Sequence, residues 1–223
     1  MINITKSQPA PECLEIEKAK VNSDNYKCGD VVKRLSEDFF DKCYLCEKKN
    51  IIPPNVEHFI PHGNDKDKKF DWDNLFYCCV HCNTAKGTLI DILNCTNPEH
   101  KILEYIEFRT DIIPHLKFRV VILAKQNNPI VLNTVSLLTK IYNGGTEIQN
   151  KSSEYLIIEI EDIIKKFLKR INKYITETDQ NEKAKYRNQI IAELQPHSAF
   201  TAFKAWYILN NENLKQEFAS FLP

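Results

Sequence analysis

Apolar residues in the second half of the chain recur at three- and four-residue steps, the spacing of one face of a helix. The clearest helix is predicted from Ser153 to Ile175, with one stripe made of Leu156, Ile160, Ile163, Ile164, Phe167, Ile171 and Tyr174. A shorter helix is predicted from Thr134 to Tyr142, ended by Asn143-Gly144-Gly145 because glycine suits the end of a helix. These patterns predict a helical region in the later part of the chain.

The end of the chain continues this helical pattern. Pro196 separates a helical stretch over residues 188–195 from a final one that holds Phe200, Phe203, Trp206, Leu214 and Phe218. The aromatic residues from Phe200 to Tyr207, like Trp72, are expected in the core. Residues 117–125 are predicted to form a strand or an extended segment. We therefore expect residues 99–223 to form a mainly helical domain.

The first hundred residues mix helix and strand signals. Residues 12–20 permit a helix, and Asp30 is predicted to cap a second one that leads into Cys43. Short strands are predicted at Ile51–Val56 and Leu75–Tyr77, with a helix from Asn83 onward. The fold class that follows is α+β but mainly helical. Its predicted parts are an N-terminal arm and helix over 1–42, a core over 43–98 and the helical domain over 99–223.

The charge of the chain is balanced, with 30 basic and 30 acidic residues. Residues 1–100 hold 13 basic and 16 acidic residues, a net charge of −3, and residues 101–223 hold 17 and 14, a net charge of +3. Neither part has the strong positive charge of a protein that grips nucleic acid unaided. No apolar run approaches the roughly twenty residues of a membrane span. The first residues also lack the apolar stretch of a signal peptide, so we expect a cytoplasmic protein.

The cysteines are unevenly distributed along the chain. All eight cysteines lie in the first 95 residues, at positions 13, 28, 43, 46, 78, 79, 82 and 95. Disulfides are rare in a reducing compartment, where clustered cysteines more often bind metal. We therefore expect no disulfide framework. Cys13, Cys28 and Cys95 are expected to be small buried apolar residues.

Two C-x-x-C pairs, Cys43/Cys46 and Cys79/Cys82, stand 32 residues apart. Such pairs can close a tetrahedral site around Zn²⁺ with four thiolate ligands. Cys78 could replace Cys79, but the second pair would then be C-x-x-x-C, so the spacing favours Cys79. A site with four cysteine ligands is closed, so this zinc would stabilise the fold, and any chemistry must lie between the pairs.

Three short segments carry that chemistry: Glu57-His58-Phe59-Ile60-Pro61, Asp71-Trp72-Asp73-Asn74-Leu75 and Cys82-Asn83-Thr84-Ala85-Lys86-Gly87. In this order, together with the cysteine pairs, they resemble the HNH endonuclease motif and its ββα-metal fold. The resemblance spans Cys43 to Gly87, about a fifth of the chain. It implies an enzyme that hydrolyses phosphodiester bonds.

The resemblance also implies a role for each residue. His58 matches the general base, Asn74 the residue that fixes the loop and the orientation of the histidine, and Glu57 and Asn83 the ligands of one catalytic cation. The four paired cysteines match the structural zinc of the zinc-bearing subset. Many family members have Asp at the position of Glu57 and His at the position of Asn83. Glu and Asn both offer oxygen donors, which suit Mg²⁺ or Mn²⁺.

Elementary chemistry agrees with these roles. A neutral imidazole, whose ordinary pKa is about 6.5, can accept the proton of an attacking water. A hard cation can stabilise the charge that develops on the phosphate. His62 and His81 have no role in the motif and are expected at the surface, although His62 could line the site. The lysines of the 63–69 loop and of 165–173 are expected to be solvated, with contact to phosphate as the alternative.

A narrower resemblance concerns residues 1–11, Cys43–Glu47, Val56–Pro61 and Asp71–Leu75. These segments are similar to the HNH subunit of Septu-type anti-phage systems, which also accompanies some retrons. In that family the nuclease acts with an ABC-type ATPase, so the resemblance implies such a partner and DNA as the favoured substrate. Two alternatives stay open: a nuclease acting on RNA such as tRNA, and an inactive zinc-binding scaffold. The intact set of Glu57, His58, Asn74 and Asn83 favours an enzyme.

Overall fold

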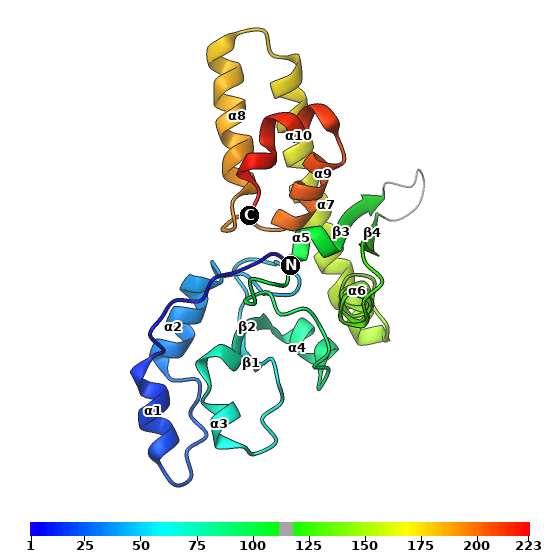
Figure 1. Cartoon of the computed structure of the whole chain (residues 1–223). Coiled ribbons are helices and arrows are strands. Elements are labelled where there is room, and N and C mark those ends of the chain that lie inside the picture. Colours follow the sequence, from blue (N-terminus) through cyan, green and yellow to red (C-terminus); the bar gives the residue numbers. More distant parts are fainter. Residues whose placement is uncertain (112–117) are drawn as a thin grey trace.

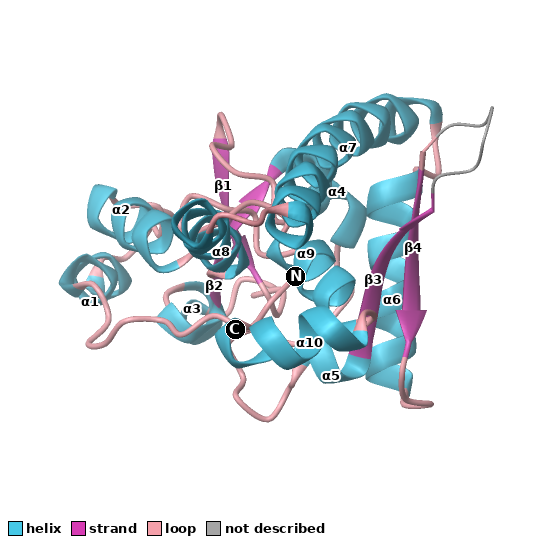
Figure 2. Cartoon of the chain, turned by 90° about the horizontal axis from the view of Figure 1, so that it is seen from above, coloured by secondary structure: helices cyan, strands magenta, loops and turns pink. Residues whose placement is uncertain are grey.

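The computed structural model describes residues 1–111 and 118–223, apart from the side chains at positions 148 and 149. The fold is mixed α/β, with 53% of residues in helices and 11% in strands. The described strands form two separate antiparallel pairs, β1–β2 and β3–β4, with helices packed around them (Figures 1 and 2). A mixed fold dominated by helix is therefore confirmed.

Helices α1 (Glu12–Ala19) and α2 (Gly29–Asp38) form the N-terminal part of the fold. The prediction that Asp30 caps α2 is wrong, because the capping position is occupied by Cys28 and Asp30 lies inside the first turn. An acidic side chain there still favours the helix through its dipole. The helix buries Val31 and Leu35.

A strand–strand–helix unit follows. Strand β1 (Pro54–His58) pairs with β2 (Leu75–Cys79), and helix α4 (Val80–Lys86) begins directly after β2. Between the strands lie the short helix α3 (Lys66–Lys69) and a 3₁₀ turn, η1 (Trp72–Asn74). β1 begins three residues later than predicted, since proline is tolerated at the first position of a strand but not within its hydrogen-bonded ladder.

The later part of the chain is mainly helical, as predicted, but it also contains a second two-stranded sheet. After the one-turn helix α5 (Ile102–Tyr105), strand β3 (Ile106–Asp111) pairs with β4 (Arg119–Ala124). β4 falls in the segment that was predicted to be extended, and Lys117 lies outside the described residues. β3 escaped prediction because its first three residues are all buried, which conceals the alternation typical of a half-exposed strand.

The later helices are longer than their apolar patterns indicated. Helix α6 (Pro129–Asn143) begins five residues before the predicted start, because Asn128 caps it and Pro129 suits its first position. It ends at Gly144, whose φ of +83° favours glycine, as predicted. Helices α7 (Glu147–Thr176) and α8 (Gln180–Leu194) pack side by side as a projecting arm (Figure 1). The side chain of Asp179 caps α8, well ahead of the predicted stretch.

The final helical stretch is divided in two. Helices α9 (Thr201–Leu209) and α10 (Glu212–Phe218) are separated at Asn211, which caps α10, and a last turn, η2 (Ala219–Phe221), follows. Trp72 and the aromatic residues Phe200, Phe203 and Trp206 are buried as predicted, whereas Tyr207 is 40% exposed. The expectation for Tyr207 is therefore wrong, because its place on α9 turns it partly outward.

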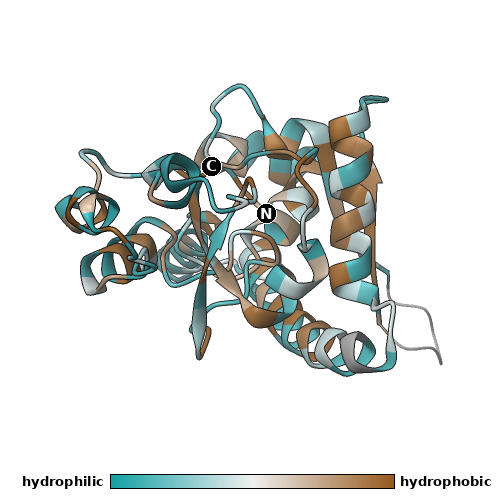
Figure 3. Ribbon diagram, turned by 90° about the horizontal axis from the view of Figure 1, so that it is seen from below, coloured by the Kyte–Doolittle hydropathy of each residue, from teal (hydrophilic) through white to brown (hydrophobic). Residues whose placement is uncertain are grey.

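One continuous hydrophobic cluster runs from Met1 to Trp206. It joins the N-terminal segment, the strand–strand–helix unit and the β3–β4 sheet, which contacts α6 and α9. A smaller cluster lies between α7, α8, α9 and α10. Figure 3 shows the corresponding alternation of apolar and polar stripes along the helices. Within the described residues, none of the helices combines the length and the apolar character that crossing a membrane requires.

Candidate metal centre and hydrolytic site

The two C-x-x-C pairs meet in space. The Sγ atoms of Cys43, Cys46, Cys79 and Cys82 all lie within 4.8 Å of one another, and three of these cysteines are buried. This arrangement could hold one metal ion such as Zn²⁺ in a tetrahedral thiolate site. The four residues brought together are the four that the spacing predicted.

Backbone contacts explain why the two pairs converge. The first pair sits in a tight turn closed by a hydrogen bond from the amide of Glu47 to the carbonyl of Cys43, at 2.9 Å. The amide of Tyr44 donates to the carbonyl of Tyr77 on β2, at 3.0 Å, which holds the turn against the sheet. The second pair occupies the first turn of α4, where Cys79 Sγ accepts from the amide of Cys82. One pair is therefore fixed by a turn and the other by a helix cap.

The turn that carries the first pair is also joined to the C-terminal helices. The carboxylate of Glu47 is buried, lies 3.4 Å from Nζ of Lys42 and accepts from the amide of Ala202 on α9. Lys42 donates in addition to the carbonyl of Ser198, at 2.8 Å. These buried contacts hold the turn and the start of α9 together.

Cys78 is a fifth cysteine beside the cluster. Its Sγ lies 3.7 Å from that of Cys43. Burial raises the pKa of the Cys78 thiol well above its ordinary value, which keeps this thiol protonated. Burial also acts to raise the pKa of Cys43, but hydrogen bonds from the neighbouring cysteines outweigh it and lower that pKa well below its ordinary value. Burial also raises the pKa of Cys46 and Cys82, so metal binding by the four cysteines would release protons from these thiols.

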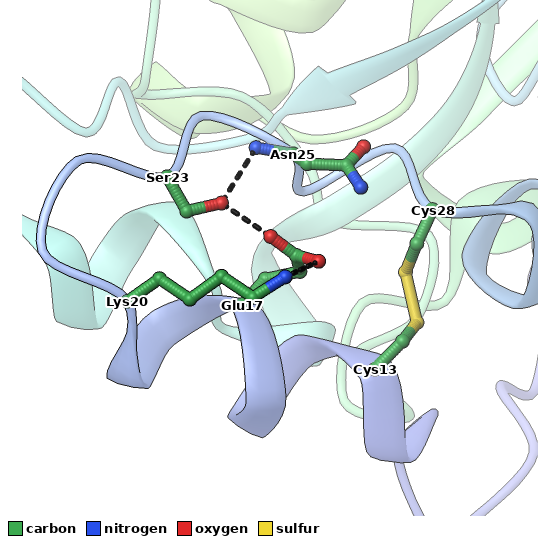
Figure 4. The surroundings of a disulfide bond; sticks show 6 residues. All are labelled: Cys13, Glu17, Lys20, Ser23, Asn25 and Cys28. Carbon is green, nitrogen blue, oxygen red and sulfur yellow. Dashed lines mark hydrogen bonds and ion pairs between the residues drawn. A yellow bond between two sulfur atoms is a disulfide. The ribbon is translucent and has the colours of Figure 1, made fainter.

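The remaining cysteines require a correction. Cys13 on α1 and Cys28 before α2 form a disulfide, so the expectations of no disulfide and of two isolated apolar cysteines are wrong (Figure 4). Packing of α1 beside the start of α2 brings the two Cα atoms to 6.6 Å, within the range that a disulfide spans. The loop between them is braced by Glu17, which pairs with Lys20 and accepts from the hydroxyl of Ser23. Cys95 is buried, as predicted.

Removing this disulfide is expected to lower the stability of the protein. The bond closes a loop with a sequence separation of 15 residues. A cross-link of that length restricts the unfolded chain by about 3 kcal/mol. The double variant Cys13→Ala/Cys28→Ala should therefore lose about 3 kcal/mol of unfolding free energy in urea titrations without reductant. Adding a dithiol reductant should lower the urea midpoint of the wild type and leave that of the variant unchanged. Equal midpoints for the two proteins without reductant would contradict the prediction.

His58 ends strand β1 and is held in one orientation. Its Nε2 lies 2.9 Å from the carbonyl oxygen of Lys69. A carbonyl can only accept, so Nε2 carries the hydrogen, and the neutral ring keeps a free lone pair on Nδ1. Burial lowers the pKa of His58, against the opposing effect of the bond to Lys69. The imidazole therefore favours its neutral form, which can accept a proton.

Aromatic rings flank this imidazole on two sides. The ring of Tyr26 lies 4.5 Å from it and the ring of His62 lies 4.7 Å from it, measured between centroids. Tyr26 belongs to the loop that the disulfide closes, so that loop covers part of the histidine. His62 therefore lies beside His58, in keeping with the alternative that it lines the site. His81 does not lie free at the surface, because it is half-buried with Nε2 bonded to the carbonyl of Ile141.

Asn74 joins the two segments around His58. Its Nδ2 donates to the carbonyls of Ile60 and Lys68, each at 2.9 Å, and its Oδ1 accepts from the amide of Ile60 at 2.7 Å. These bonds hold the chain after β1 against α3, whose Lys69 carbonyl contacts the imidazole. The side chain is itself buried, so its amide group is fully used within the protein.

Glu57 precedes His58 and points to the other face of β1, as neighbouring residues of a strand do. Its side chain is only 4% exposed, and Oε1 lies 2.8 Å from Nζ of Lys86 on α4. Among the described residues, Oε2 is buried without a hydrogen bond of normal geometry, and the thiol of Cys78, a weak donor, lies beside the carboxylate. Burial raises the pKa of Glu57, and the charge of Lys86 opposes this shift.

Asn83 is half-buried on α4, one helical turn before Lys86. Residues three apart lie on the same side of a helix, so Asn83 lies beside the lysine that reaches Glu57. Across residues 1–111 and 118–223, no hydrogen bond or ion pair joins Glu57 directly to Asn83 or to the imidazole of His58. The predicted residues thus share one strand–strand–helix unit, in which Glu57 is buried and Asn83 is half-buried.

Sequence reasoning assigned no role to two residues that contact this site. Lys86 lies in the motif itself. It follows Asn83 by three residues, so helix geometry alone would have placed the two on the same side of α4. Tyr26 is different, because it is 32 positions from His58 and no local pattern connects the two. Only the folded loop of residues 13–28 reveals its contact.

The basic clusters are largely paired within the chain. Lys66, Lys68 and Lys69 lie on the short helix α3, where Lys66 and Lys68 are exposed to solvent as predicted. Lys69 pairs with Asp24, and Lys66 donates to the carbonyl of Lys20. On α7, Lys165 and Lys166 pair with Glu161 and Asp162 one turn earlier, at 2.6 and 2.5 Å. The positive charge that these clusters offer to a phosphate backbone is therefore reduced.

Comparison with models of known protein families finds no match to this chain, and comparison with curated proteins finds none either. Functional assignment therefore depends on the residues of the site and on their chemistry.

Proposed function

We propose that this protein is a metal-dependent endonuclease of the HNH type that hydrolyses phosphodiester bonds of nucleic acid, with DNA as the favoured substrate. One observation carries the proposal. His58, whose Nε2 carries its hydrogen toward a carbonyl, follows a buried carboxylate, and in the described part of the chain neither its Nδ1 nor the carboxylate's Oε2 has a hydrogen bond of normal geometry. Both belong to a strand–strand–helix unit that is anchored by a four-cysteine cluster.

The metals have separate roles in this proposal. The four clustered cysteines would hold a structural Zn²⁺, which joins the turn at Cys43 to the start of α4. Oε2 of Glu57 and the amide oxygen of Asn83 suit a hard cation, Mg²⁺ or Mn²⁺. Such a cation, when bound, supplies compensation for negative charge developing on the phosphate.

The chain's own residues perform the proton chemistry. Nδ1 of His58 accepts a proton from the attacking water, and the ring becomes positively charged. The carbonyl of Lys69, already bonded to Nε2, stabilises that charge. Asn74 keeps the surrounding loop in place, which preserves the direction of Nδ1 during the reaction. Tyr26 and His62 limit access of other water molecules to the ring.

We also propose that the nuclease acts with an ABC-type ATPase in an anti-phage defence complex. The resemblance to Septu-type subunits suggests the partner, and charge supplies a physical reason for one. Affinity for nucleic acid comes largely from Lys and Arg residues that neutralise phosphates. The chain has no net charge, and lysines of both basic clusters are paired internally. The helical region after residue 99 is the proposed docking surface, because helical faces with aromatic anchors suit such contacts.

The isolated chain is therefore expected to bind DNA weakly and to cut it slowly at about 150 mM salt, because it carries no net positive charge and lysines of both basic clusters are paired with acidic residues. Binding should be measured by fluorescence anisotropy and cleavage under the same conditions, with and without the ATPase. Lowering the salt serves as the control and should strengthen binding. Nanomolar affinity and rapid cleavage without a partner would contradict this prediction.

The proposed activity is tested by incubating the zinc-loaded protein with DNA and with RNA in the presence of Mg²⁺ or Mn²⁺. The assay should use low salt and high protein concentration, so that weak binding does not conceal activity, and should be repeated with the ATPase. Cleavage of DNA that is lost in His58→Ala supports the proposal. Cleavage of RNA alone would favour the RNA alternative. No cleavage of either polymer under any of these conditions would favour the inactive scaffold.

A further inference from the structure

The partner of Glu57 is enclosed as completely as Glu57 itself. The side chain of Lys86 is 0% exposed, and Nζ lies 2.8 Å from Oε1 of Glu57. Nζ also lies 3.4 Å from the carbonyl oxygen of His58 and 5.6 Å from the centre of the Phe59 ring. Burying an ion pair costs desolvation of both charges, so the pair alone is weak evidence of a purely stabilising role.

The pair also leaves the carboxylate incompletely satisfied. Among the described residues, Oε2 of Glu57 is buried without a hydrogen bond of normal geometry, and its neighbour Cys78 offers only a weakly donating thiol. A carboxylate has two oxygens and can accept several bonds, but the lysine reaches only one of them. Glu57 is therefore already paired with the ammonium group of Lys86, and its second oxygen can still coordinate a metal cation.

We propose that Lys86 is the resident counter-ion of Glu57 and that a divalent cation displaces its ammonium group on binding. The proposal rests on the proposed function, in which Glu57 binds the catalytic cation. Two positive charges on one buried carboxylate repel each other strongly where water is excluded. The flexible four-carbon stem of lysine allows the ammonium to move while α4 stays in place. Lys86 thus neutralises the negative charge of Glu57 while the divalent cation is absent. It also lowers the affinity of the site for that cation, because the cation must displace it.

The first test measures Mn²⁺ binding to the zinc-loaded full chain by isothermal titration calorimetry. Lys86→Met keeps most of the apolar stem and removes the charge, so Mn²⁺ should bind roughly tenfold or more tightly than to the wild type. Lys68→Met is the matched control, because it removes the same charge from an exposed position on α3 and should leave the affinity unchanged. Glu57→Gln should abolish this binding.

The outcomes separate the two proposals. Equal or weaker binding by Lys86→Met, with binding by the wild type abolished in Glu57→Gln, would overturn the role of Lys86 and leave the cation site intact. Binding that Glu57→Gln does not change, or no binding by any of the proteins, would overturn both the role of Lys86 and the assignment of Glu57 as a cation ligand.

A second test uses the wild type and does not depend on the folding of a variant. Acetylation by a water-soluble amine-reactive ester, mapped by mass spectrometry, should spare Lys86 without Mn²⁺ and modify it at saturating Mn²⁺. Lys204, whose side chain is 1% exposed on α9, is the buried reference and should stay protected under both conditions. A Lys86 that remains equally protected at saturating Mn²⁺ would overturn the displacement.

Discussion

Replacing Cys46 by serine is expected to release the bound metal and to unfold the segment from Cys43 to Gly87. The serine hydroxyl is a poor replacement for the thiolate, and the turn at Cys43 would lose its connection to α4. Structural zinc supplies about 10–16 kcal/mol of apparent binding free energy in small zinc-finger peptides at neutral pH, so the loss should be large. Metal analysis should find one zinc per wild-type chain and less in the variant, with a lower Tm.

Two further cysteine variants serve as controls. Cys95→Ser changes a cysteine that is equally buried but lies outside the cluster, so it should keep its zinc. Cys78→Ser should also keep zinc, because the four mutually close sulfur atoms include Cys79 and not Cys78. A wild-type protein purified without chelator and found free of zinc would show the assignment of the metal centre to be wrong. Loss of zinc in Cys78→Ser would show that the ligand set needs revision.

Replacing His58 by alanine is expected to abolish measurable cleavage. Loss of a general base typically lowers the rate by about 10²–10⁴-fold. The fold and the zinc content should not change, because the imidazole is only half-buried and lies outside the four-cysteine cluster. The measurement is single-turnover cleavage of DNA, accompanied by circular dichroism and metal analysis. His197→Ala, which changes an exposed histidine, is the matched control and should cleave as the wild type does.

The response to cation concentration distinguishes a base from a ligand. Glu57→Ala and Asn83→Ala should weaken the affinity for the catalytic cation, so excess Mn²⁺ should restore part of their activity. The same excess should not restore His58→Ala, because the missing group there is the proton acceptor. Full cleavage by His58→Ala would refute its assignment.

Much of the candidate metal centre could be predicted because its ligands are close in sequence. In each C-x-x-C pair the two cysteines are separated by two residues, and a turn or the first turn of a helix brings their sulfur atoms together. The apolar period of three and four residues likewise revealed the helix that runs from Glu147 to Thr176. Both signals arise within a few residues, where backbone geometry allows few arrangements.

Helix boundaries and the second sheet were less predictable. Asp30 has a residue type that caps helices, yet Cys28 occupies the capping position and makes no capping hydrogen bond with its side chain. The pairing of β3 with β4 depends on residues from two segments, and the burial of Ile106, Glu107 and Phe108 removed the alternation that indicates a strand. Propensity is a weak guide where tertiary contacts decide.

By itself, the sequence determined the four clustered cysteines, the order of the two strands and the helix that follows them, and the motif that holds Glu57, His58, Asn74 and Asn83. Only the tertiary structure decided the disulfide between Cys13 and Cys28, the contact of Tyr26 with His58 and the pairing of Lys86 with Glu57. The physical reason is distance along the chain. Local spacing determines which side chains share a turn or a helix face, whereas residues 15 to 32 positions apart meet only when packing of the whole core fixes the elements that carry them.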